Sequence, residues 1–181
     1  MPKNALIITD MLNTYDHEDA EPLAASVEEK LPCIVRIRDL AEDDPDTMVI
    51  YVNDNYDRWE ASRDDLVQSA LEGKRPDLVE PIVPQGSVPF LQKGRHSIFY
   101  ETALGHLLRI NDVERITLVG QVTEQCILYS ALDGYIRDYE VSIPPDAVAH
   151  IDPELAKAAL RMMETNLHAN VTPAAQTAPQ G

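Results

Sequence analysis

Short apolar runs alternate with amphipathic stretches along almost the whole chain, and this order constrains the fold more than any other feature. Most of the runs are continuously apolar, which is typical of strands that are buried on both faces. They cover residues 4–10, 47–54, 87–93, 115–120 and 139–148, with a last extended piece near Asn170. The alternation predicts an α/β fold: a three-layer αβα sandwich with a central, mostly parallel sheet of about six strands.

Helical spacing of apolar residues fills most of the segments between these runs. It covers residues 22–40, 59–71, 97–110, 124–138 and 153–169. Residues 73–89 are rich in proline and predict a long loop. One domain is therefore expected over residues 1–171, and the low-complexity end, residues 172–181, is expected to be a flexible tail.

The charge of the chain excludes two classes of partner. The formal net charge is −16, from 31 acidic and 15 basic residues. Such a protein repels nucleic acid and anionic lipid, so neither is an expected partner. No apolar run approaches the roughly 20 residues that span a bilayer. The two cysteines, Cys33 and Cys126, form no disulfide framework, so free thiols and a cytoplasmic, reducing location are expected.

Polar residues at the ends of the predicted strands are the candidates for a functional site. In parallel α/β sheets, ligands bind just beyond the carboxyl ends of the strands. The residues at those positions are Asp10, Asn53, Asp54, Lys93, the stretch 123–126, and Asp146.

Cys126 is the most informative of these candidates. With Thr123 as the helix N-cap, Cys126 would be the third helical residue, where the helix dipole favours a thiolate. A lysine at the neighbouring strand end, Lys93, would lower the pKa of the thiol further, and Asp10 could carry its proton. Free backbone N–H groups in the first turn could receive an oxyanion. A buried structural cysteine is the alternative, and it is the preferred interpretation of Cys33.

Three segments carry a resemblance to a known family. They are ALIITDMLNTY, LQKGRHSIFYETAL and ITLVGQVTEQCILYSALDGYIRDYEVSIPPDAV, which together span most of residues 5–150. In order and spacing they resemble the motifs of the isochorismatase-like cysteine hydrolase superfamily, which includes nicotinamidases, N-carbamoylsarcosine amidohydrolases and ureidoacrylate hydrolases.

The resemblance implies a mechanism and an assembly. Asp10, Lys93 and Cys126 match the catalytic triad of the superfamily. A cis peptide is implied between Gln121 and Val122, with the N–H groups of Val122 and Cys126 as the oxyanion hole. The implied reaction is hydrolysis of an amide, ureido or carbamoyl C–N bond of a small molecule through a thioester. A homo-oligomer, a dimer or tetramer, is also expected, partly because Ile82, Val83 and Val88 in the proline-rich loop lack an obvious partner within one subunit.

Two positions depart from the superfamily pattern. Leu12 stands where many members have Gln. Asn53, Asp54 and Asn55 stand where nicotinamidases have Asp-x-His metal ligands. A zinc or iron site of that type needs imidazole ligands, so neither a metal nor another cofactor is expected, and nicotinamidase activity is not favoured. The substrate-binding candidates are Tyr15, Trp59, Arg95 and Gln121, with His96, Phe99 and Tyr129 as further possible neighbours.

Three other functions are alternatives to this interpretation. A non-catalytic or redox-sensing thiol protein would use the same cysteine for oxidation. Isochorismatase-type ether hydrolysis is a second alternative, although some members with that activity lack the cysteine. Phosphoryl transfer by Asp10 in the manner of haloacid dehalogenases is disfavoured, because Leu12 occupies the position of the second acid.

Overall fold

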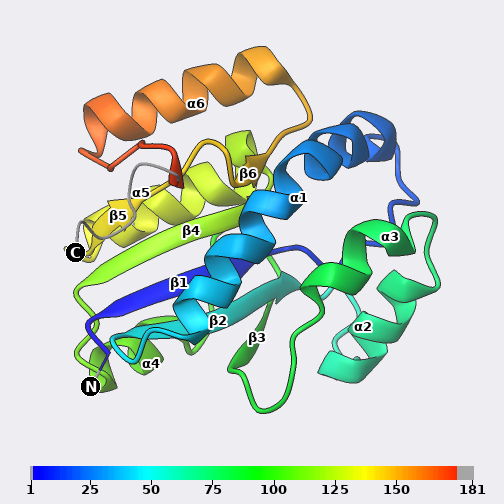
Figure 1. Cartoon of the computed structure of the whole chain (residues 1–181), viewed down its shortest axis with the longest axis horizontal. Coiled ribbons are helices and arrows are strands. Elements are labelled where there is room, and N and C mark those ends of the chain that lie inside the picture. The colour runs from blue at the N-terminus through cyan, green and yellow to red at the C-terminus, as the bar shows by residue number, and fades with distance from the viewer. Residues whose placement is uncertain (1, 175–181) are drawn as a thin grey trace.

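The computed structural model describes residues 2–174 of the chain. Its centre is a six-stranded sheet in which every strand pairing is parallel. The strand order is β3-β2-β1-β4-β5, and β6 pairs with the end of β4 (Figure 1). The strands are β1 (Asn4–Thr9), β2 (Thr47–Asp54), β3 (Phe90–Lys93), β4 (Arg115–Gln121), β5 (Glu140–Ser142) and β6 (Val148–Ala149).

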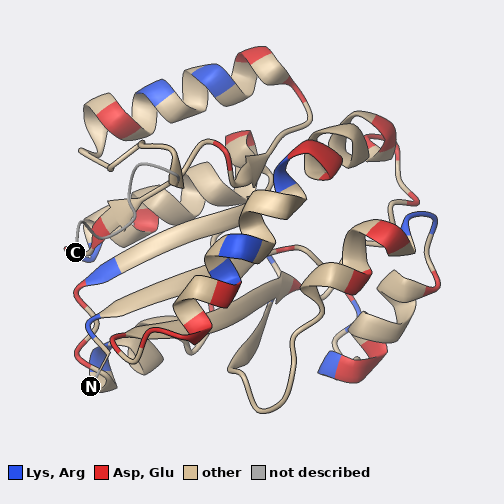
Figure 2. Ribbon diagram, viewed as in Figure 1, with Lys and Arg blue, Asp and Glu red and all other residues tan. Residues whose placement is uncertain are grey.

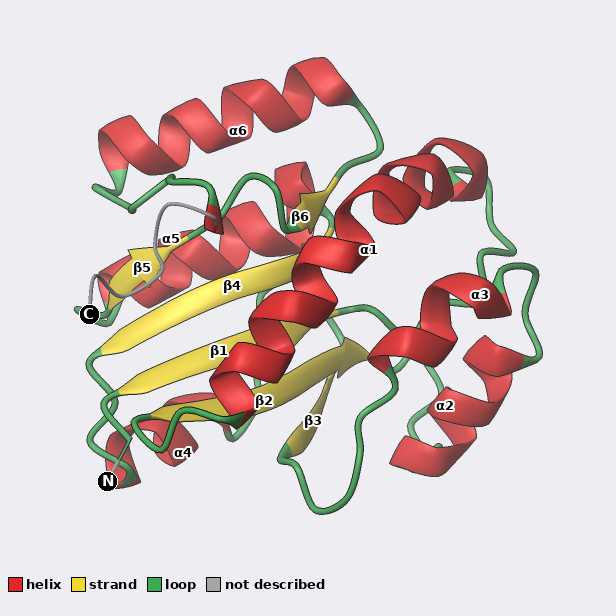
Figure 3. Cartoon of the chain, in the orientation of Figure 1, coloured by secondary structure: helices red, strands yellow, loops and turns green. Residues whose placement is uncertain are grey.

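Helices cover both faces of the sheet (Figure 3). Buried side chains of α1 (Ala20–Glu42), α2 (Arg63–Leu71) and α3 (Pro76–Val79) belong to the core on one face. Those of α4 (Leu104–Ile110), α5 (Leu128–Ile136) and α6 (Pro153–Asn166) belong to the core on the other face. The predicted three-layer sandwich with a parallel sheet is thereby confirmed.

The continuous apolar run of β1 follows from its place between the two cores. Leu6 and Ile8 pack into the core beneath α1. Ala5 and Ile7 pack into the core beneath α4, α5 and α6. Because successive side chains of a strand point to opposite faces, a central strand covered on both sides is apolar at nearly every position.

The predicted strand at residues 139–148 is divided into β5 and β6. Pro144 and Pro145 lie between the two pieces, and proline cannot donate a ladder hydrogen bond. The extended piece near Asn170 is present as an isolated bridge to Ser142. The Asn170 carbonyl accepts a hydrogen bond from Ile143 N at 2.9 Å.

The proline-rich segment 73–89 is more ordered than the sequence predicts. It contains α3 and a 3₁₀ turn, η1 (Glu80–Ile82), and Pro76 is the first residue of α3, a position that proline tolerates. Ile82 is fully buried, and Val83 and Val88 pack against the same core. The prediction that these three residues lack a partner within the subunit is wrong.

Charged residues are concentrated on the helices and at the ends of strands (Figure 2). Asp146 accepts a hydrogen bond from Ala174 N at 2.9 Å, so the first residues of the predicted tail lie against the domain. The remainder of that tail, residues 175–181, lies outside the described residues. Across residues 2–174, no helix combines the length and apolar character needed to cross a bilayer.

Candidate active site

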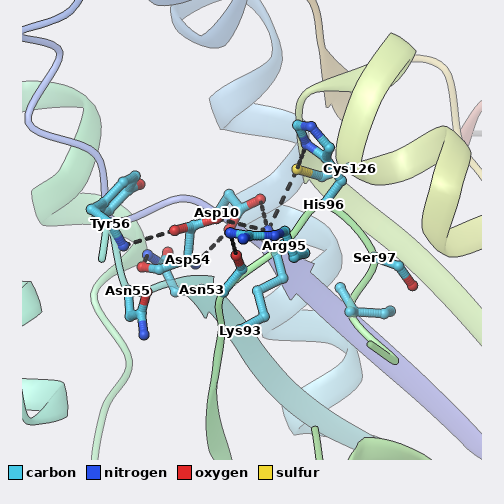
Figure 4. Close-up of polar contacts among 12 residues, drawn as sticks. Asp10, Asn53, Asp54, Asn55, Tyr56, Lys93, Arg95, His96, Ser97 and Cys126 are labelled. Carbon is cyan, nitrogen blue, oxygen red and sulfur yellow. Dashed lines mark hydrogen bonds and ion pairs between the residues drawn. The ribbon is translucent and has the colours of Figure 1, made fainter. Parts of the chain in front are cut away.

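Three of the predicted site residues meet at the carboxyl edge of the sheet (Figure 4). Asp10 follows β1, Lys93 ends β3, and Cys126 lies just after β4. Lys93 Nζ is 2.9 Å from Asp10 Oδ2 and donates to Cys126 Sγ at 3.5 Å. The lysine side chain is fully buried. Parallel strands that end at one edge thus bring together residues far apart in sequence.

A glycine lets β4 approach β1 at this edge. Gly120 has a φ of 109°, and a Cβ atom there would lie 2.2 Å from the backbone oxygen of Thr9. Only glycine fits this close approach without displacing β1. The peptide bond that follows the next residue, between Gln121 and Val122, is cis.

The helix that carries the thiol begins one residue earlier than predicted. Val122 is the N-cap, and residues Thr123–Ile127 form a π-helical turn (η2) that leads into α5. The Thr123 hydroxyl donates to Ala149 O at 2.9 Å instead of capping the helix. The prediction of Thr123 as N-cap is therefore wrong, and Cys126 is the fourth helical residue. It still lies in the first turn, where N–H groups lack a full set of helical partners.

A second strand-end carboxylate, Asp54, for which the sequence predicted no catalytic role, contacts the lysine. Asp54 Oδ2 lies 3.5 Å from Lys93 Nζ. Its backbone N–H donates to Asp10 Oδ1 at 2.7 Å. Asp54 ends β2, as its position at the end of an apolar run predicts, and it is the register partner of Lys93 in β3.

Burial and the two carboxylates decide the ionisation of the site. Burial raises the pKa of Asp10, and the charge of Lys93 only partly opposes this. Burial lowers the pKa of Lys93, but the carboxylates of Asp10 and Asp54 and the Cys126 thiolate together raise it above its ordinary value.

The pKa of the Cys126 thiol is raised, first by burial and then by the charge of Asp10, and Lys93 does not offset both. The prediction of a lowered thiol pKa is wrong. The lysine charge is already balanced by its carboxylates, so it stabilises a thiolate less than an unpaired ammonium would.

Tyr15 and Gln121 are buried behind Asp10. Gln121 Nε2 donates to the Asp10 carbonyl at 2.6 Å, and the Tyr15 hydroxyl donates to Gln121 Oε1 at 3.5 Å. The two side chains therefore hold the backbone of Asp10 in place.

Trp59 and Arg95 are exposed, and both contact Gly94. The Trp59 ring packs against Gly94, so closely that a Cβ atom there would lie 2.6 Å from it, yet the residue is 72% exposed. Arg95 Nη1 donates to the Gly94 carbonyl at 2.8 Å. Phe99 does not reach the site, because it is buried in the core against Tyr139.

His96 contacts the thiol from the solvent side. Its Nδ1 lies 3.6 Å from Cys126 Sγ, and its ring centroid is 5.4 Å from that of Tyr129. The imidazole is exposed, in contrast to Lys93 and Asp10.

Asn53 and its neighbours hold the loop after β2 in place. The Asn53 carboxamide accepts from Leu12 N at 2.9 Å and donates to the carbonyls of Leu12 and Asp54. No cluster of three or more His, Cys, Asp or Glu side chains able to share a metal ion occurs within residues 2–174. The absence of a metal requirement stays a prediction.

Comparisons with known proteins agree with this geometry. Residues 4–176 match the isochorismatase domain. The chain is 36% identical over 168 residues to the isochorismatase family protein YaaI of Bacillus subtilis (strain 168), which covers 93% of this chain and 92% of that one.

Two solved structures have a fold similar to that of this chain. A nicotinamidase from Bacillus subtilis has a TM-score of 0.71 at 25% identity, over 94% of this chain and 99% of the other. An N-carbamoylsarcosine amidase from Thermoplasma acidophilum has a TM-score of 0.68 at 26% identity, over 99% of each chain.

The fold and these comparisons together identify the chain as a hydrolase of the isochorismatase-like class. The chain belongs to the isochorismatase family.

Proposed function

We propose that the protein is a cysteine-dependent hydrolase that cleaves an amide, ureido or carbamoyl C–N bond of a small molecule. The observation that carries this proposal is the buried contact chain from Asp10 through Lys93 to Cys126, with distances of 2.9 and 3.5 Å. A thiol nucleophile, a carboxyl group that can move a proton, and a fixed cation are the parts that such a reaction needs.

Acylation begins with a neutral thiol, because its pKa is raised. Asp10 takes the thiol proton as Cys126 Sγ attacks the substrate carbonyl carbon. The backbone N–H groups of Val122 and Cys126 receive the oxyanion. Asp10 then returns the proton to the leaving nitrogen, the C–N bond breaks, and a thioester remains on sulfur.

Deacylation uses the same groups with water in place of the thiol. Asp10 takes a proton from water, whose oxygen attacks the thioester carbon. The C–S bond then breaks, and the thiol recovers its proton. The raised pKa of Asp10 suits this alternation, because a more basic carboxylate takes a proton from the thiol or from water more readily. Lys93 stays protonated and balances the charge that passes between Asp10 and sulfur.

Substrate binding is assigned to two groups of residues. Trp59 and Arg95 are exposed beside Gly94 and would contact the substrate directly. Tyr15 and Gln121 are buried and would act mainly by fixing Asp10. Neither a metal nor an organic cofactor enters this mechanism.

The alternative of a redox-sensing thiol receives little support from the site. Oxidation requires an accessible thiolate. Cys126 is only 8% exposed, and its pKa is raised. Ether hydrolysis would leave the thiol and its proton acceptor without a role.

A screen for ammonia release tests the proposal. Small amides, ureides and carbamoyl compounds would be incubated with the purified protein, and the active compound would then be incubated with hydroxylamine. Release of ammonia together with formation of a hydroxamate supports a thioester, because hydroxylamine intercepts it. Turnover that yields no hydroxamate at high hydroxylamine would contradict the thioester.

We also propose that the protein is a homo-oligomer. Because the apolar residues of the proline-rich loop are packed within the subunit, the interface is placed on α5 and α6 instead. Tyr129, Leu132 and Ile136 on α5 and Met162 on α6 are exposed. Tyr129, Leu132 and Met162 line an apolar hollow of about 160 Å³ between the two helices. On a strongly acidic protein, an apolar surface of this kind suits a second copy of itself, related by a two-fold axis. A cytoplasmic location also belongs to the proposal, because it would keep the nucleophile reduced.

A further inference from the structure

We propose that His96 is a further catalytic residue, which exchanges the proton of the Cys126 thiol from the solvent side of the site. The inference rests on the proposed function, in which Cys126 is the nucleophile. It adds a second proton partner to the thiol, on the side opposite Lys93 and Asp10.

The geometry of three side chains carries the inference. Cys126 Sγ has Lys93 Nζ at 3.5 Å on its buried side and His96 Nδ1 at 3.6 Å on its open side (Figure 4). The tilted contact with Tyr129, at 5.4 Å between ring centroids, holds the imidazole ring. The ring is therefore positioned with a nitrogen atom toward sulfur.

Exposure distinguishes His96 from the rest of the site. Lys93 and Asp10 are both buried, whereas His96 is exposed. A proton that leaves the thiol toward Asp10 stays inside the protein. A proton that passes to His96 can equilibrate with solvent. The imidazole thus couples the ionisation of a buried thiol to the pH of the medium.

The step itself is a single proton transfer. In the tautomer that carries its proton on Nε2, Nδ1 is an acceptor. The proton moves from Sγ to Nδ1, the S–H electron pair stays on sulfur, and no other bond changes. The products are a thiolate and an imidazolium, so the total charge is conserved. The thiolate is then flanked by two cations.

Other charged or titratable groups lie around this pair and influence the same equilibrium. They are Tyr129 and Asp133 on α5, Arg95 beside the histidine, and Lys93 with its partners Asp10 and Asp54 beyond the sulfur. Asp133 is engaged by the Ser97 hydroxyl and by Arg137, so its charge is largely compensated.

The test is the pH dependence of alkylation of the full-length protein by iodoacetamide, which requires no substrate. Cys33→Ala serves as the parent, so that Cys126 is the single thiol. The alkylation rate of the parent is expected to show an inflection with pH that requires the His96 imidazole, because histidine is a titratable neighbour of the thiol. His96→Phe keeps an aromatic ring against Tyr129 but removes the nitrogen, and the inflection is expected to disappear.

Two further variants complete the design. His96→Asn keeps a hydrogen-bonding group that does not titrate, and it should also lose the inflection. It decides the test if the phenylalanine variant does not fold. His168→Asn is the matched control, because His168 also contacts an aromatic residue of α5, Tyr135, but near the end of that helix farthest from Cys126. It should keep the parent profile.

The outcomes separate this inference from the proposed function. Persistence of the inflection in either His96 variant would overturn the inference. Loss of the inflection in His168→Asn would do the same, because the effect would not be specific to His96. A parent that shows the His96-dependent inflection but hydrolyses no amide, ureide or carbamoyl compound would uphold the proton exchange and reject the proposed reaction.

Discussion

Lys93 lies closer to Asp10 than to the nucleophile: its Nζ is 2.9 Å from Asp10 Oδ2 and 3.5 Å from Cys126 Sγ. The ammonium therefore compensates the carboxylate first. Because Asp54 also lies 3.5 Å away, little of the lysine charge is left to stabilise a thiolate. The site is consequently arranged to store a proton and to move it during the reaction.

The first prediction concerns the ionisation of the thiol. The charge of Asp10 raises the pKa of Cys126, so Asp10→Asn should lower the pH at which iodoacetamide alkylation accelerates. Lys93 acts in the opposite direction, so Lys93→Met should raise that pH. Both profiles would be measured in the Cys33→Ala parent, after circular dichroism has shown that the variants are folded.

In the Asp10→Asn variant, we expect turnover to fall while the reactivity of the Cys126 thiol rises. Asp10→Asn should have a more reactive thiol and yet lose turnover by about 10²-fold or more, because no group remains to carry the proton to the leaving nitrogen. Near-normal turnover of Asp10→Asn would show that Asp10 is only a structural residue of the strand end.

The second prediction concerns the close approach of β4 and β1. Gly120→Ala should destabilise the protein by more than about 4 kcal/mol, because its Cβ atom would collide with the backbone of Thr9. Gly86→Ala is the matched control: Gly86 also has a positive φ, of 56°, but nothing lies near its Cβ position.

The control should cost only about 1–2 kcal/mol, the penalty of the left-handed backbone alone. Urea denaturation would measure both free energies of unfolding. Equal destabilisation of the two variants would mean that the contact with Thr9 has no effect of its own.

The third prediction concerns assembly. Light scattering should give a multiple of the 20.2 kDa chain mass. Leu132→Glu on α5 should shift the protein toward monomer, because it places a charge in the proposed apolar interface. Leu40→Glu is the matched control, since Leu40 is equally an exposed leucine but lies on α1. A wild-type mass near that of one chain would refute the proposed oligomer.

The fourth prediction concerns metal. Prolonged dialysis against a chelator should leave the rate of hydrolysis unchanged, since Asn53 and its neighbours replace imidazole ligands and are engaged in backbone hydrogen bonds. Elemental analysis would accompany the assay. A stoichiometric zinc or iron that is lost together with activity would contradict the mechanism.

The sequence predicted the sheet well because buried parallel strands have a strong local signal. The runs around Ile7, Ile50 and Leu118 are apolar at nearly every position, since both faces of each strand are covered. The meeting of Asp10, Lys93 and Cys126 was predictable from strand ends and from motif resemblance, because one edge of a parallel sheet gathers all its carboxyl ends.

The features that the sequence did not predict depend on long-range contacts. Thr123 has a good capping side chain, but its hydroxyl bonds to Ala149 on β6 instead. Asp54 was among the strand-end candidates, but its contact with Lys93 follows only from the register of β2 and β3. The raised thiol pKa follows from the distances around Lys93, which no sequence pattern contains.

The turnover of Cys126→Ala, measured as ammonia release beside that of Cys33→Ala, tests the central claim most directly. Cys33 is a free thiol on α1, away from the site, so its variant controls for the loss of a cysteine as such. The proposed mechanism predicts that Cys126→Ala loses activity by several orders of magnitude, roughly 10⁴-fold or more, as expected when a covalent nucleophile is removed. Cys33→Ala should keep nearly all of its activity. Full activity of Cys126→Ala would contradict nucleophilic catalysis by this thiol.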